Sequence, residues 1–142
     1  MSRQGPKFNL TDVKRLAQDY LDGKKASDGR GSIRFNAPTR STEVVVKVLF
    51  CRPDIANRLI AIGLLALEAK DFFSRKMQWN EVYDEFGLED YEGHNWYIKY
   101  CIVSDDGTEY VEEVSFHPLE KEMVLPNGKT LRVTYDPSEE KG

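Results

Sequence analysis

The sequence predicts an α+β fold, in which N-terminal helices pack on an antiparallel β-sheet and an extra hairpin follows at the C-terminus. Apolar residues recur at helical spacing in the first half, whereas segments rich in β-branched and aromatic residues, separated by turn signals, fill the second. Helices followed by a meander of strands are typical of α+β proteins. The 142 residues are expected to form a single domain, 1–142, with flexible ends at 1–8 and 136–142.

The first helix is expected to begin at Leu10, because the side chain of Asn9 can cap it, and to end at Gly23. Residues 23–32 are small, polar and basic, so they should form a mobile loop. A short strand is expected at Ile33–Phe35. The apolar residues at helical spacing are Leu10, Val13, Leu16, Ala17, Tyr20 and Leu21.

The segment 43–50 is ambiguous. Its four valines favour a strand, but Ser41 or Thr42 can cap a helix and the apolar residues do not alternate cleanly, so we predict a helix. Pro53 suits the first turn of the next helix. That helix is apolar nearly all round as far as Leu67, which predicts burial against a sheet rather than a membrane span.

Strands are expected throughout the second half of the chain. The three main candidates are 78–86, 94–103 and 109–117. Asp106-Gly107 should form the turn between the last two of them. Asn127-Gly128 is a strong hairpin signal, and the short flanking strands would be 123–125 and 130–133.

The twofold period of a strand assigns side chains to faces. Trp96 and Ile98 share one face, and we expect them to cover the buried helix together with Val114 and Phe116. The other face of the strand 94–103 holds Tyr97, Lys99, Cys101 and Val103. In the strand 109–117 we expect one face to hold Tyr110, Glu112, Val114 and Phe116. The other face should hold Val111, Glu113, Ser115 and His117. A phenol, an ammonium and an imidazole would then converge on the uncovered side.

This set of side chains suits phosphodiester cleavage without a metal. The reaction needs a base for the ribose 2′-hydroxyl, cations for the charged phosphorane and an acid for the leaving oxygen. His117 can be the base or the acid. The cations would be Lys99, Lys76 and Arg75, and Tyr97 or Tyr83 would donate a proton or stack on a base. The alternative is an ordinary solvated sheet face on which His117-Pro118 simply ends a strand.

Several segments, in order, resemble the MqsR family, toxins of toxin–antitoxin pairs with a RelE-like fold. Leu10–Leu16 is similar to the family's opening helix, and 54–73 to its next helix and the motif that follows. The matching strand motifs are Trp79-Asn80-Glu81-Val82-Tyr83, Tyr97-Ile98-Lys99-Tyr100 and Val114-Ser115-Phe116-His117. The resemblance implies a ribosome-independent mRNA endonuclease that needs no metal and is silenced by an antitoxin.

The resemblance also implies where the active-site residues lie. The family's tyrosine corresponds to Tyr97, and its glutamine to Asn80, which keeps the amide. Its first lysine falls on Ser74, with Arg75 close by, and its second falls on His117. About 25 residues follow His117, where the family typically ends, and they are expected to add the hairpin.

Charge is unevenly distributed along the chain. Residues 1–60 hold 12 Lys/Arg and 6 Asp/Glu, whereas residues 61–142 hold 8 and 18, and the net charge is −4. The asymmetry indicates either a basic and an acidic binding surface or two solvated faces of unequal sign. Acidic residues in the strand half would repel RNA if they lined its groove. A basic footprint would then have to come from Lys24, Lys25, Arg30, Arg34 and Arg40, if the basic loop folds over the same face.

The two cysteines are expected to be free thiols, and no Cys/His spacing resembles a zinc site, so no metal or other cofactor is expected. No signal peptide or membrane span is evident, and we predict a cytoplasmic protein that acts on mRNA and binds a cognate antitoxin or another protein. The alternative is a non-catalytic protein-binding module, such as a phage- or plasmid-encoded inhibitor, on the same scaffold. The predicted catalytic residues are Tyr97, His117, Lys99 and Asn80, and the predicted RNA-binding residues are Lys76, Arg75, Tyr83 and Arg34.

Overall fold

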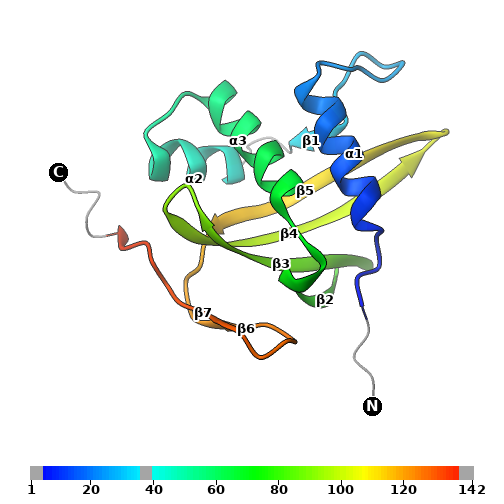
Figure 1. The fold of residues 1–142 in the computed structure, drawn as a ribbon. Helices are drawn as coiled ribbons and strands as arrows, with labels where there is room; N and C mark the ends of the chain where they lie inside the picture. The colour runs from blue at the N-terminus through cyan, green and yellow to red at the C-terminus, as the bar shows by residue number, and fades with distance from the viewer. Residues whose placement is uncertain (1–4, 36–39, 138–142) are drawn as a thin grey trace.

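A computed structural model describes residues 5–35 and 40–137, apart from the side chains of Glu113 and Val114. The three helices are α1 (Leu10–Leu21), α2 (Arg40–Leu49) and α3 (Pro53–Ala66), and a short 3-10 turn at Ala69–Asp71 follows them. The main strands are β1 (Ile33–Phe35), β2 (Phe72–Gln78), β3 (Glu81–Tyr91), β4 (His94–Asp105) and β5 (Thr108–Pro118). The helices lie together on one side of the sheet, which confirms the α+β prediction (Figure 1).

The five strands form one sheet in the order β1-β5-β4-β3-β2. Strands β2 to β5 form an antiparallel meander, and β1 adds to β5 in parallel, with Ile33 opposite Val111. The predicted turn at Asp106-Gly107 joins β4 and β5, and both residues have positive φ, at 51° and 78°. Such φ values make a type I′ turn, which matches the twist of the flanking strands.

The three predicted helices are confirmed. The side chain of Asn9 caps α1 by accepting the Thr11 N–H at 2.8 Å. The ambiguous valine segment is helical and buries Val45 and Val48 on one face, so its spacing outweighs the strand propensity of valine. Pro53 is the first residue of α3, where its missing N–H would in any case have no partner within the helix.

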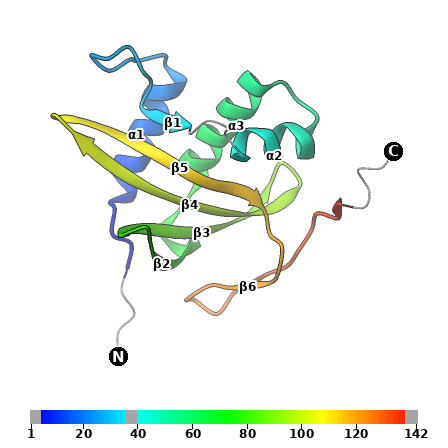
Figure 2. The same cartoon turned by 180° about the vertical axis from the view of Figure 1, so that it is seen from behind.

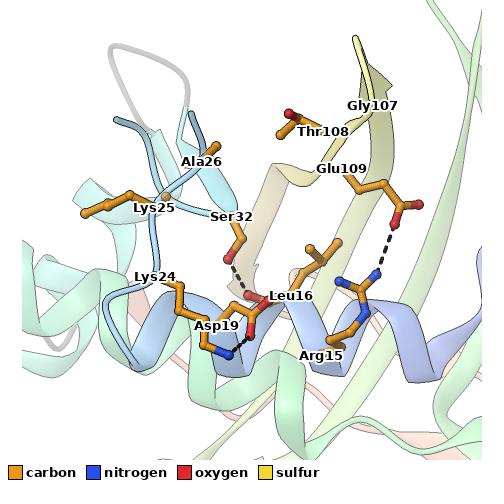
Figure 3. Close-up of a pocket in the computed structure, with 11 residues that line it drawn as sticks. Arg15, Leu16, Asp19, Lys24, Lys25, Ala26, Ser32, Gly107, Thr108 and Glu109 are labelled. Carbon is orange, nitrogen blue, oxygen red and sulfur yellow. Dashed lines mark hydrogen bonds and ion pairs between the residues drawn. The ribbon is translucent and has the colours of Figure 1, made fainter. Parts of the chain in front are cut away.

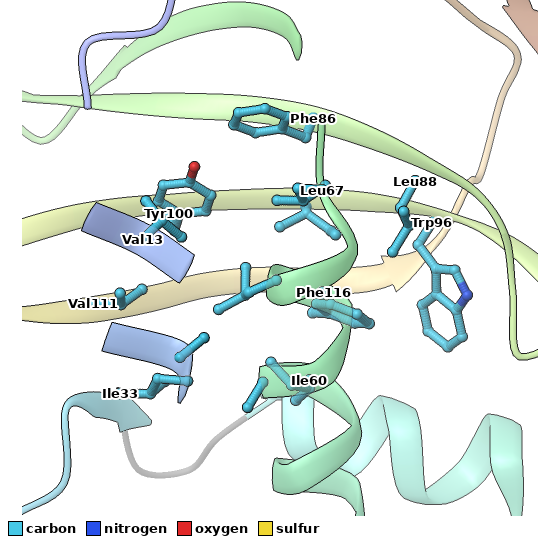
Figure 4. Packing of buried hydrophobic residues seen from close by; sticks show 14 of the residues in the cluster. Val13, Ile33, Ile60, Leu67, Phe86, Leu88, Trp96, Tyr100, Val111 and Phe116 are labelled. Atoms are coloured by element: carbon cyan, nitrogen blue, oxygen red, sulfur yellow. The ribbon is translucent and has the colours of Figure 1, made fainter. Parts of the chain in front are cut away.

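The core lies between the helices and the sheet (Figure 4). Val13 of α1 and Ile60 of α3 pack against aromatic rings of the strands. Gly63 lets α3 approach the sheet closely, because a Cβ atom there would lie 2.7 Å from Cζ of Phe116. The fully buried aromatic side chains of the sheet are Phe86, Trp96, Tyr100 and Phe116. Burying each of them contributes roughly 1.5–3 kcal/mol, so this layer supplies much of the stability.

The single strand predicted at 78–86 is wrong. The structure has two strands, β2 and β3, joined by a tight turn at Trp79-Asn80, where φ is 54° and 60°. This turn conformation usually requires glycine or a short polar residue, and a tryptophan in its first position gives no hairpin signal. Strand β2 begins at Phe72, six residues before the point at which strands were expected to begin.

The predicted faces of β5 are wrong for its first half. The register passes from Lys99 opposite Ser115 to Tyr100 opposite Glu113, so one extra residue is inserted between them. This β-bulge exchanges the two faces. Val111, expected on the uncovered side, is buried beneath the helices, while Glu112 lies on the uncovered side opposite Cys101. Ser115 and His117 follow the bulge and keep their predicted side.

The predicted C-terminal hairpin is present as β6 (Met123–Val124) and β7 (Thr130–Leu131). It lies on the side of the sheet away from the helices (Figure 2). Its buried residues Met123 and Leu131 form a second small core, against which Phe73 and Tyr97 pack. Gly87 of β3 makes this contact possible, because a Cβ atom there would lie 2.5 Å from Sδ of Met123.

The N-terminal segment 5–8, expected to be flexible, is hydrogen-bonded to the sheet. The backbone N–H groups of Lys7 and Phe8 each donate to the buried carboxylate of Asp84 at 2.9 Å. Arg75 donates from Nε to the carbonyl of Gly5 at 2.7 Å. At the other end, predicted to be flexible over 136–142, residues 136 and 137 are described and exposed, and residues 1–4 and 138–142 lie outside the described part of the chain. In the part of the chain that is described, each helix is too short or too polar to cross a membrane.

Candidate functional site

Tyr97, Lys99, Ser115 and His117 share the face of β4 and β5 that points away from the helices, as predicted. Tyr97 lies directly opposite His117, and their ring centroids are 5.1 Å apart at an interplanar angle of 32°. Lys99 lies opposite Ser115 in the neighbouring pair. Lys99 and His117 are therefore diagonal neighbours on one sheet face, at positions roughly 7–8 Å apart.

Lys99, Ser115 and His117 line a cleft with a volume of about 800 Å³, whereas Tyr97 lies outside its lining. The cleft lies where β5 ends, between α2, the Trp79-Asn80 turn and the segment that follows β7. Among the described residues its charged lining consists of Arg40, Lys47, Lys99 and Glu120. With three cations and one carboxylate, these lining residues carry a net positive charge, although the net charge of the whole chain is negative.

His117 is oriented by the backbone. Its Nδ1 lies 2.8 Å from the carbonyl oxygen of Pro118, and the Glu120 carboxylate is 3.8 Å away. Because a carbonyl oxygen only accepts, Nδ1 carries the hydrogen in this contact. The neutral imidazole therefore keeps its lone pair on Nε2, which is the form that a general base needs.

Lys99 has a buried stem and a well-positioned ammonium group. The residue is only 5% exposed, and its Nζ donates to Oε1 of Gln78 at 2.6 Å. The same Nζ lies 5.6 Å from the ring centroid of Trp79 and 5.4 Å from that of Tyr83. Rings and amide together fix the position of a positive charge that would otherwise sample many rotamers.

Tyr97 does not direct its hydroxyl into the cleft lining. Its O–H donates to Oε2 of Glu85 at 2.5 Å. Burial, together with the hydrogen bond to Glu85 and the charge of that carboxylate, raises the pKa of Tyr97 well above its usual range. The phenol therefore stays protonated, and what it presents to His117 is the flat side of its ring.

Three other predicted site residues, Asn80, Lys76 and Tyr83, do not line the cleft. Asn80 is exposed in the turn and does not line the cleft. Lys76 lies opposite Tyr83 on β2 and is exposed. Tyr83 is only 5% exposed, and its ring lies perpendicular to that of Trp79, with the centroids 6.2 Å apart. Tyr83 therefore supports its neighbours and offers no open ring face to a base.

Arg75 and Arg34 are not brought to the cleft. Arg75 lies opposite Asp84 and holds the N-terminal segment through its hydrogen bond to Gly5. Arg34 of β1 is buried, donates to the carbonyl of Gly31 at 3.0 Å and lies 4.1 Å from the ring of Tyr110. Both guanidinium groups have structural partners elsewhere in the fold.

A second pocket of about 250 Å³ lies between α1, the loop 24–32 and the β4–β5 turn (Figure 3). Four of its five charged lining residues are paired, Lys24 with Asp19 at 3.3 Å and Arg15 with Glu109 at 3.0 Å. The turn and His117 are separated by most of β5, or roughly 30 Å. The basic loop therefore lies far from the cleft along the sheet.

Sequence reasoning missed three residues that line the cleft. Arg40 was named only as part of a possible footprint, and Lys47 and Trp79 were not considered as site residues. Lys47 gives no local signal, because a lysine on a helix is common. Trp79 gives no local signal either, because a tryptophan within a predicted strand is ordinary.

Cys51 and Cys101 are free thiols, as predicted. Burial, and the nearby carboxylate of Glu112, raise the pKa of Cys101 to about 12, so this thiol is not a ready nucleophile. Within residues 5–35 and 40–137, no three His, Cys, Asp or Glu side chains come together in a way that could hold a metal ion.

No protein-family model matches the chain, and it has no significant match among curated proteins or solved structures. The resemblance to the MqsR family therefore stays a prediction.

Proposed function

We propose that the chain is an endoribonuclease that cleaves mRNA in the cytoplasm without a metal, as the toxin of an MqsR-like toxin–antitoxin pair. One observation carries the proposal: His117, oriented with Nε2 as its basic nitrogen, and Lys99 line the same cleft, whose charged lining among the described residues is three cations and one carboxylate. An imidazole and fixed cations are what cleavage of a phosphodiester by its own 2′-hydroxyl requires.

The proposed reaction begins when Nε2 of His117 takes the proton of the ribose 2′-hydroxyl. The 2′-oxygen attacks phosphorus, the bond from phosphorus to the 5′-oxygen breaks, and a 2′,3′-cyclic phosphate remains. Lys99 stabilises the charge that develops on the phosphorane oxygens. The leaving 5′-oxygen needs a proton. Because the hydroxyl of Tyr97 already donates to Glu85, the ammonium of Lys99 is the better-placed donor.

The test is cleavage of a single-stranded RNA by the purified chain in the presence of EDTA. We expect fragments that end in 2′,3′-cyclic phosphates, because the mechanism needs no metal. Replacing His117 by Ala should lower the rate by at least 100-fold, since general-base catalysis is typically worth 10²–10⁴-fold.

The chain contains a matched control. His94 is the other histidine, and it does not line the cleft itself, although its ring packs on Tyr135, which does. His94→Ala removes an imidazole and one packing contact but no proposed base, so it should slow cleavage far less than His117→Ala does. If His117→Ala cleaves as fast as the parent, the proposal is wrong. A stable stoichiometric complex with another protein and no RNA turnover would support the alternative, a non-catalytic inhibitor.

A further inference from the structure

Trp79 is an unusually exposed aromatic residue. It occupies the first position of the turn between β2 and β3, with a positive φ of 54°, and is 70% exposed. A positive φ is costly for a bulky residue, and an exposed indole adds little to the stability of the core. Neither the turn nor the core therefore requires a tryptophan here.

The surroundings of Trp79 connect it to the proposed catalytic residues. The indole lines the same cleft as Lys99 and His117. The Lys99 ammonium lies 5.6 Å from its ring centroid, and Tyr83 meets it edge-on at an interplanar angle of 88°. These contacts hold the indole in place while most of its surface stays open to solvent.

We infer that Trp79 is a stacking platform for an unpaired base of the nucleotide whose phosphate lies at Lys99 and His117. The inference depends on the proposed function, because it requires RNA in the cleft. Every nucleobase has a flat π-face that stacks on an exposed aromatic ring. A base inside a duplex has both faces covered by its neighbours, so the platform selects single-stranded segments.

The charge of the cleft favours a nucleic acid over an apolar peptide as the occupant. Arg40, Lys47 and Lys99 suit phosphates, and the exposed ring beside them suits a base. Trp79 rather than Tyr83 is therefore the stacking residue in this inference, because the ring of Tyr83 is buried.

The intrinsic fluorescence of the chain reports on this site directly. The chain has two tryptophans, and the other one, Trp96, is fully buried with its indole N–H bonded to the carbonyl of Tyr91. An oligodeoxynucleotide lacks the 2′-hydroxyl, so it tests binding without cleavage. We expect a single-stranded ten-residue oligodeoxynucleotide to quench the emission of Trp79, and the corresponding duplex to leave it unchanged.

Variants separate stacking from charge. Trp79→Ala should weaken binding roughly 5- to 100-fold, and Trp79→Phe, which keeps a ring, should lose much less. The matched control is Met77→Ala. Met77 is 68% exposed on the opposite side of the same hairpin, so its replacement should not change binding.

The outcomes distinguish this inference from the proposed function. If Trp79→Ala binds as tightly as the parent while cleavage still depends on His117, the stacking inference is wrong and the nuclease proposal stands. If the oligonucleotide quenches Trp79 but RNA is never cut, the platform stands and the nuclease proposal is wrong. Equal quenching by single strand and duplex overturns the selection for unpaired bases.

Discussion

At the scale of single residues, the role of Tyr97 differs most from what its sequence position suggests. The family resemblance makes Tyr97 a catalytic residue, yet its hydroxyl donates to Glu85 and its ring packs on His117. A protonated phenol that already has an acceptor is a poor proton donor to a leaving group. We therefore expect Tyr97 to act chiefly by positioning the imidazole.

Replacing Tyr97 by Phe tests this role. The ring that packs on His117 remains, so RNA cleavage should fall by less than tenfold. The nearly buried carboxylate of Glu85 loses its donor, and the free energy of unfolding should fall by about 1–3 kcal/mol. Urea denaturation and cleavage rates measure the two effects separately. Glu85→Gln is the companion variant, because its amide oxygen can still accept from the phenol.

One outcome would instead support a catalytic role for the Tyr97 hydroxyl. If Tyr97→Phe folds like the parent but cleaves at least 100-fold more slowly, the hydroxyl takes part in proton transfer, because losses of this size are typical of a missing acid or base.

At the scale of elements, the contact between β3 and the C-terminal hairpin depends on a glycine. A Cβ atom at Gly87 would lie 2.5 Å from Sδ of Met123 and 2.7 Å from Cδ1 of Leu131. The methionine side chain can move, but the leucine is buried between the hairpin and the sheet. The hairpin positions the segment after β7, which carries Val133 and Tyr135 into the cleft.

Gly87→Ala should therefore displace the hairpin. We expect a loss of about 1–3 kcal/mol of unfolding free energy from the overpacked contact. Cleavage by a protease within 119–131 should become faster while α1 and α3 stay protected. The control is Val124→Ala, an exposed position on the hairpin itself, which should change neither quantity. Unchanged proteolysis of Gly87→Ala would contradict this account of the hairpin contact.

The elements that could be predicted from the sequence are those with local signals. The helix that starts after Asn9 and the turn at Asp106-Gly107 follow from capping and turn chemistry alone. Strand β2 could not be predicted, because its turn places a tryptophan where glycine or asparagine is usual. The bulge in β5 could not be predicted either, since an inserted residue is visible only in the pairing with β4.

At the scale of the whole molecule, some residues of the candidate site could be predicted from the sequence and others could not. The convergence of Tyr97, Lys99 and His117 follows from the twofold period of two neighbouring strands. The contributions of Arg40 and Lys47 depend on where α2 packs along β5, and that is decided by tertiary contacts. The net charge of the chain therefore says little about the charge of the cleft.

Salt dependence of binding tests whether the cleft, rather than the whole surface, attracts nucleic acid. Neutralising Z phosphates of a single strand gives a slope of roughly −0.7Z for log K against log salt concentration. With three cations in the cleft, the slope for a ten-residue oligodeoxynucleotide should be about −2. Lys47→Gln should make the slope shallower by about 0.7. Lys24→Gln, in the second pocket at the far end of β5, should leave it unchanged. A slope that responds equally to both substitutions would contradict a cleft-centred site, because binding would then follow the total charge of the chain.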